Sequence, residues 1–167
     1  MTKTITAVFN TRFESEAALR KLEQAGFNKD QVTMLITEET RGKHFGIDEG
    51  NKSDQAAAVG AAIGGLTGAL YLALASAGTL FIPGLNIVVS GALVGALAGL
   101  GAGGATGGLI GGLVGLGIPE HEAKLYEDAI RKGAILIAVE ADDDMRAERV
   151  KEILKGSNAQ SITALAA

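Results

Sequence analysis

The sequence contains no cysteine and no tryptophan, and it has two prolines and few aromatic residues. The absence of cysteine excludes disulfides, thiol chemistry and cysteine-ligated metal sites. Aromatic residues make up 4% of the chain, too few for base-stacking platforms. The 15 basic and 19 acidic residues give a net charge of −4, whereas a nucleic-acid binder normally carries a basic face. We therefore expect no nucleic-acid partner.

Charge is also missing from the whole middle of the chain. Residues 56–118 contain no Asp, Glu, Lys, Arg or His, so every charged side chain lies in one of the two flanks. Glycine is in excess, with 24 among 167 residues, about twice its usual share. The length indicates one domain, or one domain with an insertion. We divide the chain into a first flank (residues 1–55), an apolar insert (residues 56–118) and a second flank (residues 119–167).

The first flank has the pattern of a strand, a helix and a second strand. Apolar and polar residues alternate over residues 4–9, which predicts a strand. Residues 14–25 have apolar side chains at helical spacing and are followed by Gly26, which predicts a helix with a glycine C-cap. Residues 31–37 predict a second strand.

The second flank repeats this succession. A connecting helix over residues 119–132 ends at Gly133, and a strand, a helix and a strand follow over residues 134–140, 142–155 and 160–165. Asp142 or Asp143 caps the last helix, and Gly156 ends it. Each half has about 35 residues, too few for an independent core, so the halves must meet. They predict an α+β, ferredoxin-like βαββαβ domain in which the insert replaces the central hairpin loop.

The insert predicts a transmembrane helical hairpin. Its 63 uncharged residues far exceed the roughly 20 that one crossing needs. Ile82, Pro83 and Gly84 form the best break between two helical arms, residues 56–82 and 85–118. Both flanks must lie on one side of the membrane to complete one sheet, which favours two crossings. Basic residues flank the insert, so the positive-inside rule predicts an inner-membrane protein with both termini in the cytoplasm.

Glycines recur at four-residue intervals in the insert. The candidate oligomerisation residues are Gly60, Gly64, Gly68, Gly91, Gly95, Gly99, Gly103, Gly107, Gly111 and Gly115. Such small-xxx-small rows let helix backbones approach closely, so we expect a glycine zipper. A four-residue step advances about 40° around a helix, so one partner helix cannot cover the whole row. The predicted partners are therefore further copies of this chain and membrane lipid. Two alternatives stay open: a flexible low-complexity segment, and a soluble assembly that buries the hairpins between subunits.

These segments resemble bacterial proteins with a general-stress-protein (heat-induced stress protein) type domain split by a glycine-zipper membrane segment. The resemblance rests on ITAVFNTRFESEAALRKLEQAGF and AILIAVEADDDMRAERVKEIL for the ends of the domain, and on the glycine-rich run with its following helix. It implies a bacterial, stress-associated membrane protein with no assigned chemistry and no catalytic residues to transfer.

Residues that could carry chemistry are few. The histidines are His44 and His121, and Glu120, His121 and Glu122 lack the second histidine at helical spacing that a metal site needs. The run 142–144 of three aspartates lacks the spacing and glycine of a calcium loop. The glycine-rich run 101–108 lacks the Lys-Ser/Thr of a phosphate-binding loop. We therefore predict no catalytic, cofactor-binding or metal-binding residues, no cofactor and no enzymatic activity.

The sequence thus favours a non-enzymatic, self-associating membrane scaffold with a cytoplasmic ferredoxin-like domain and, through the resemblance, a role in stress. An oligomeric pore formed by the zipper helices is the first alternative. A soluble oligomer or a small-ligand sensor is the second.

Overall fold

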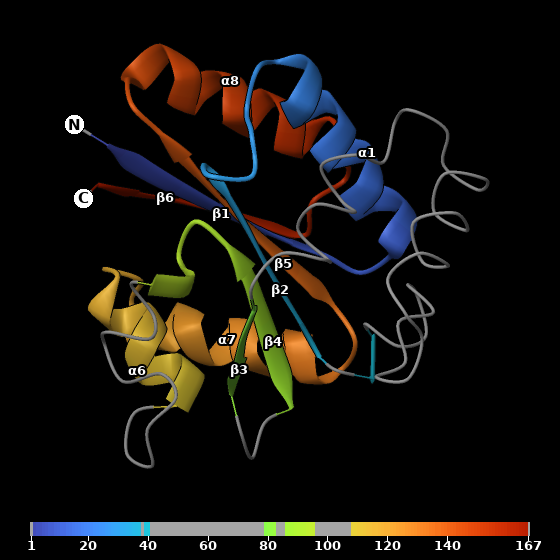
Figure 1. The fold of residues 1–167 in the computed structure, drawn as a ribbon, viewed down its shortest axis with the longest axis vertical. Helices are drawn as coiled ribbons and strands as arrows, with labels where there is room; N and C mark the ends of the chain where they lie inside the picture. The colour runs from blue at the N-terminus through green and yellow to red at the C-terminus, as the bar shows by residue number, and fades with distance from the viewer. Residues whose placement is uncertain (1, 38, 41–78, 83–85, 96–107, 167) are drawn as a thin grey trace.

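The computed structural model describes residues 2–37, 39–40, 79–82, 86–95 and 108–166 (Figure 1). Its elements are six strands and four helices among the described residues: β1 (Lys3–Phe9), α1 (Arg12–Gln24), β2 (Val32–Thr37), β3 (Thr79–Ile82), β4 (Ile87–Gly91), α6 (Gly108–Gly115), α7 (Glu120–Arg131), β5 (Ile135–Ala141), α8 (Asp144–Lys155) and β6 (Ser161–Ala166). The strands and helices expected in both flanks are present.

The two flanks combine into one antiparallel sheet. β1 lies between β5 and β6 and pairs with both, and β2 pairs with the other side of β5. The flank strands therefore lie in the order β2-β5-β1-β6, with each flank contributing strands that alternate with those of the other. This interleaving is consistent with a ferredoxin-like arrangement, and it makes each half depend on the other for its hydrogen bonds.

The prediction for the insert is wrong. Where the structure describes residues 56–118, they form β3, β4 and α6. No helix in the described ranges is long and apolar enough to cross a membrane. The longest described helix of the insert, α6, has 8 residues, which span about 12 Å against the ~30 Å of a bilayer core. This finding overturns the transmembrane hairpin in the predicted fold class and the predicted inner-membrane location, and the chain is α+β.

The error has a physical reason. The break expected at Ile82, Pro83 and Gly84 lies between β3 and β4, which pair antiparallel with Ile82 opposite Ile87. β4 also pairs with β2, so it extends the sheet made by the flanks. Ile87 and Val89 pack into the core on one face of the sheet and Val88 into the core on the other face. A strand that is covered on both faces has apolar residues at successive positions. Its sequence therefore lacks the alternation that would distinguish it from a membrane helix.

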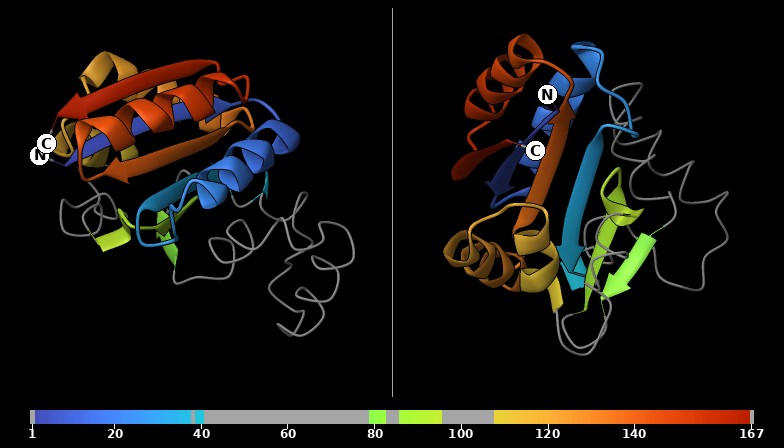
Figure 2. Two further views of the ribbon diagram at one scale, coloured as in Figure 1. Left: turned by 90° about the horizontal axis from the view of Figure 1, so that it is seen from above. Right: turned by 90° about the vertical axis from the view of Figure 1, so that its left-hand side faces the viewer.

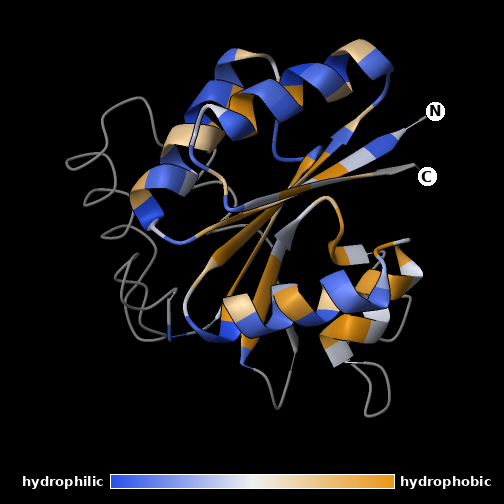
Figure 3. Cartoon of the chain, turned by 180° about the vertical axis from the view of Figure 1, so that it is seen from behind, coloured by the Kyte–Doolittle hydropathy of each residue, from blue (hydrophilic) through white to orange (hydrophobic). Residues whose placement is uncertain are grey.

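Helices cover both faces of the sheet (Figure 2). One core lies between the sheet and α1 with α8, and it includes Leu19, Leu22, Val150 and Leu154 from those helices. The second core lies under α6 and α7 and includes Leu109, Leu113, Tyr126 and Ile130. Figure 3 shows mostly hydrophobic central strands and hydrophilic outer sides on α1 and α8. The insert therefore supplies part of the second core as well as two strands.

Local signals at the helix ends agree with the sequence in most places. The Asp143 carboxylate accepts a hydrogen bond from the backbone N–H of Arg146 at 2.7 Å, which confirms the expected cap of α8. Gly26 follows α1 with φ +87°, a left-handed conformation that suits glycine. Gly156 differs, because its backbone is right-handed helical and Asn158, with φ +67°, takes the left-handed conformation.

Candidate functional site

The predicted oligomerisation glycines do not form one helical row in the described part of the chain. Gly91 is the last residue of strand β4, whereas Gly111 and Gly115 belong to α6. A Cβ atom built at Gly95 or Gly111 would meet nothing within 4 Å. Gly60, Gly64, Gly68, Gly99, Gly103 and Gly107 lie outside the described residues.

Gly91 has a different role from the predicted one. Its φ is +111°, and a Cβ atom there would lie 2.0 Å from the backbone oxygen of Val32 on β2. The next residue, Ala92, donates its N–H to that same oxygen at 3.1 Å. Only a residue without a side chain allows this approach, so Gly91 serves the junction between the insert and the first flank.

A groove of about 410 Å³ lies between α7 and the start of β6, and we call it the α7–β6 groove. It is lined by Val8, Asn10, His121, Glu122, Leu125, Tyr126, Ala129, Gln160 and Ser161. The residues come from β1, α7 and the segment that leads into β6, so the groove exists because α7 packs beside the edge of the sheet.

The base of this groove is held by hydroxyl groups. The buried Tyr126 hydroxyl donates to Thr163 Oγ1 of β6 at 2.9 Å and lies 3.0 Å from Thr6 Oγ1 of β1. Thr6 Oγ1 also donates to the backbone oxygen of Thr163 at 3.4 Å. These bonds fix α7 against β1 and β6, so the three hydroxyls are occupied in joining elements of the two flanks.

One carboxylate that lines the groove has a buried oxygen without a hydrogen-bond partner among the described residues. Glu122 Oε2 is buried and has no hydrogen-bond partner among the described residues, while Oε1 lies 3.9 Å from Nε2 of the exposed His121. Glu120, by contrast, pairs with Lys124 at 2.6 Å. No group of three His, Asp or Glu side chains within the described ranges is placed to hold a metal ion. His44 lies outside those ranges.

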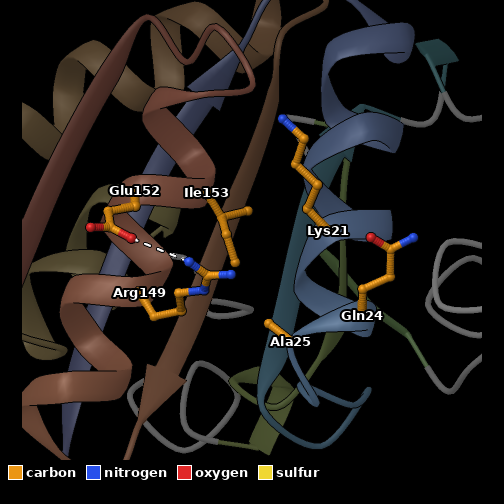
Figure 4. A pocket seen from close by; sticks show the side chains of 6 residues that line it. All are labelled: Lys21, Gln24, Ala25, Arg149, Glu152 and Ile153. Carbon is orange, nitrogen blue, oxygen red and sulfur yellow. Dashed lines mark hydrogen bonds and ion pairs between the residues drawn. The ribbon is translucent and has the colours of Figure 1, made fainter.

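A second hollow, of about 270 Å³, lies between α1 and α8 (Figure 4). Lys21 and Gln24 of α1 and the following Ala25 line one side, and Arg149, Glu152 and Ile153 of α8 line the other. Its cations already have partners, because Lys21 Nζ donates to the backbone oxygen of Gly156 at 2.9 Å and Arg149 Nη1 lies 3.4 Å from Glu152 Oε2. The hollow therefore lies at a contact between two helices, and each of its two cations already has a hydrogen-bonding or ionic partner.

Groups with displaced pKa values lie outside both hollows. Hydrogen bonding to Asp144 raises the pKa of Lys3, and the same contact lowers the pKa of Asp144. A hydrogen bond from Asn158 lowers the pKa of Glu14, and hydrogen bonds from Lys124 and Lys151 lower the pKa of Glu120 and Glu148. The contacts of Lys3 with Asp144, Glu120 with Lys124 and Glu148 with Lys151 are ion pairs at the surface, and such pairs contribute little to stability.

The sheet ends at β6, which pairs with β1 and has no second partner among the described strands. Its residues Ser161–Ala166 include no charged residue and no proline. Ser161 and Ala164 are exposed, and Ile162 and Thr163 are half-buried. Figure 2 shows β6 at the rim of the sheet, beside α8. Among the described residues, no strand pairs with the backbone N–H and C=O groups on the outer side of β6.

Sequence reasoning identified β6 as a closing strand but gave it no function. The signal was available in the predicted fold, because the last strand of a βαββαβ sheet lies at one edge. The groove was not predicted, since it depends on how α7 crosses the sheet. Comparisons with protein-family models, curated proteins and solved structures found no match to this chain. The resemblance to bacterial stress proteins therefore stays a prediction.

Proposed function

We propose that this chain is a non-enzymatic protein that self-associates and serves as a scaffold. The observation that carries the proposal is the β6 edge, which no described strand covers and which has six residues with neither a charge nor a proline. Folded proteins usually block such edges with charged side chains, prolines or bulges, because an unblocked edge pairs with other strands. An edge without these devices is suited to pairing with a second chain.

The resemblance to stress proteins extends this proposal to a stress-associated scaffold. The alternative function as a pore required the transmembrane hairpin, which the fold contradicts. The exposed leucine of α7, Leu125, supports association, since it is 64% exposed next to the same edge of the sheet.

The test is the mass of the full chain in solution, measured by light scattering after size-exclusion chromatography over a range of concentrations. We expect a dimer or a larger discrete particle that dissociates on dilution. A chain that remains monomeric at about 100 μM, a hundred times above a micromolar dissociation constant, contradicts the proposal.

A small-ligand sensor is the second candidate function, and the α7–β6 groove favours it. The groove combines apolar walls with the amides of Asn10 and Gln160 and with the Glu122 carboxylate. This arrangement suits a small ligand that donates hydrogen bonds to a carboxylate. A library of amines and amides should then contain a compound that raises the melting temperature of the wild-type chain and not of Glu122→Gln. Equal shifts in the two proteins, or none, contradict the sensor.

A further inference from the structure

We infer that two copies of this chain join by antiparallel pairing of their β6 strands, about a two-fold axis normal to the sheet. The inference rests on the proposed self-association and adds the surface, the symmetry and the orientation of the partner. The sheets of the two copies would form one continuous sheet across the axis.

Strand β6 is compatible with pairing to its own copy. An antiparallel pair of identical strands about a two-fold axis makes the same hydrogen bonds in both directions, so the interface closes at two subunits. In such a pair a charged residue near the axis would face its own like charge. The residues Ser161–Ala166 carry no charge, so the symmetric pair has no such repulsion.

Helix α8 carries a row of charges beside this edge. The side of α8 that faces α1 carries Arg149, Glu152 and Ile153, which line the α1–α8 hollow. A row on another side contains Asp144, Glu148, Lys151 and Lys155, at the helical spacing of four, three and four residues. Asp144 Oδ1 lies 2.8 Å from Lys3 Nζ on β1, the neighbour of β6. The row is therefore on the side of α8 toward β1 and the β6 edge.

The order of charges in this row suits an antiparallel partner. Acidic side chains occupy the N-terminal half, Asp144 and Glu148, and basic side chains occupy the C-terminal half, Lys151 and Lys155. A two-fold axis normal to the sheet keeps both α8 helices on the same face and reverses their directions. The acidic half of one helix then lies alongside the basic half of the other, which favours this orientation. A parallel arrangement would place like charges together.

The opposite face of the sheet adds an apolar contact. Leu125 of α7 is exposed and lines the α7–β6 groove together with Gln160 and Ser161 at the start of β6. The same two-fold axis brings α7 of the second copy to this face, so the exposed leucines of both copies lie at the rim of one interface. Hydrogen bonds between strands, charge pairs on one face and apolar contacts on the other therefore favour the same partner.

The lack of cysteine allows a direct test on the full chain. Single cysteines are placed at Ser161, Ile162, Thr163 and Ala164, with Val114→Cys on α6 as an exposed control that does not line the groove. A two-fold strand pair brings one β6 position opposite its own copy, so oxidation should give a disulfide-linked dimer with a sharp maximum at one β6 position. Cross-linking at β6 that does not exceed the Val114→Cys control overturns the inference.

Light scattering and cross-linking together distinguish a failure of the β6 interface from a failure of self-association. A chain that scatters as a dimer but fails to cross-link through β6 leaves self-association intact and contradicts this interface. A chain that is monomeric at every concentration contradicts the proposed function itself.

Charge variants test the orientation independently. Lys151→Glu with Lys155→Glu makes the row entirely acidic, and Asp144→Lys with Glu148→Lys makes it entirely basic. Each protein alone should dimerise about tenfold more weakly, which corresponds to about 1.4 kcal/mol, because like charges replace the exposed charge pairs between the two α8 helices. A mixture of the two should form heterodimers that native mass spectrometry detects. Arg149→Glu, on the side facing α1, should not change the dimer. Homodimers of unchanged affinity together with no preference for the heterodimer contradict the antiparallel arrangement.

Discussion

Both the flanks and the insert of this chain contain many apolar residues. The two regions differ in whether charged residues accompany them. In the flanks, charged residues mark the solvent side of α1 and α8, and their apolar residues form one core with the strands. In the insert no charged residue marks a solvent side, and the described part of it is built into the sheet and the second core. The comparison shows that an uncharged segment can be part of a sheet and a protein core, and that it need not be wholly buried, since Gly111, Val114 and Gly115 of α6 are exposed.

The largest expected effect is the difference in stability between a substitution at Gly91, which lies against the backbone of β2, and one at Gly111, which lies in open space. Gly91→Val should destabilise the chain by at least about 4 kcal/mol, because it combines a left-handed backbone with a Cβ atom 2.0 Å from the Val32 oxygen. Gly111→Ala, in open space on α6, should be neutral or stabilise by up to about 1 kcal/mol. Urea unfolding followed by circular dichroism measures both. Equal effects at the two positions would support a uniform glycine row and contradict the described fold.

A pair of core substitutions tests whether the insert is integral to the fold. Leu22 of α1 and Leu109 of α6 are both fully buried, one in each core. Leu22→Ala and Leu109→Ala should each cost about 3 kcal/mol, the usual effect of truncating a buried leucine. Both should shift a single cooperative transition observed by urea unfolding. If Leu109→Ala leaves the midpoint unchanged while Leu22→Ala lowers it, the insert is not part of the cooperative unit.

The difference between the regions also explains how far the sequence could be interpreted. Alternation, amphipathic spacing and the caps at Gly26 and Asp143 are local signals, and they located the flank elements to within a few residues. The break expected at Ile82, Pro83 and Gly84 falls between β3 and β4, but the elements on its two sides were misassigned, because Ile87, Val88 and Val89 are buried on both faces of the sheet. Whether an uncharged run lies in lipid or in a protein core depends on long-range packing, and this packing cannot be deduced from a local sequence pattern.

The α7–β6 groove, too, could be predicted from local sequence patterns only in part. His121 and Glu122 were noted as neighbours on a helix, and this much follows from spacing. Their position beside Gln160 and Ser161 depends on the crossing of α7 over the sheet, which brings together residues about 40 positions apart. The edge position of β6 was implicit in the predicted topology, and it became a candidate interface once the strand order and the charge row of α8 were known.

A smaller effect tests how α7, which follows the insert, is tied to the strands of both flanks. Tyr126→Phe removes the hydroxyl that bonds to Thr163 and lies 3.0 Å from Thr6, and it should cost about 1–2 kcal/mol. A double-mutant cycle with Thr163→Val isolates the hydrogen bond, and a coupling energy above about 0.5 kcal/mol is expected for groups in direct contact. Strictly additive losses in urea unfolding would show that the hydroxyl network does not join α7 to β6.

The smallest expected effect concerns pH and should originate in the charged flanks. Asp144 has a pKa below its ordinary value of 3.8 because Lys3 donates a hydrogen bond to it. A lowered folded-state pKa means that the pair stabilises the fold at neutral pH, and this contribution is lost as the pH falls through the lowered value. Lys3 has a pKa raised above 10.5, so its contribution is lost at the alkaline end, as the pH rises through that raised value.

Lys3→Gln should therefore lower stability slightly at pH 7 and flatten the acid limb of the stability curve below about pH 4, where the wild-type Asp144 becomes protonated. The measurement is urea unfolding from pH 7 to pH 2.5 for both proteins. Lys124→Gln is a reference for the effect of one exposed pair, since it removes a similar exposed partner, that of Glu120, within α7 alone. The Lys3 pair joins β1 to α8, whereas the Lys124 pair joins two turns of one helix. Because an exposed pair between elements and an exposed pair within a helix are both weak, the two variants should differ from wild type in the same direction. An acid limb that Lys3→Gln leaves superimposable on that of the wild type would show that this pair does not contribute to the pH dependence of folding.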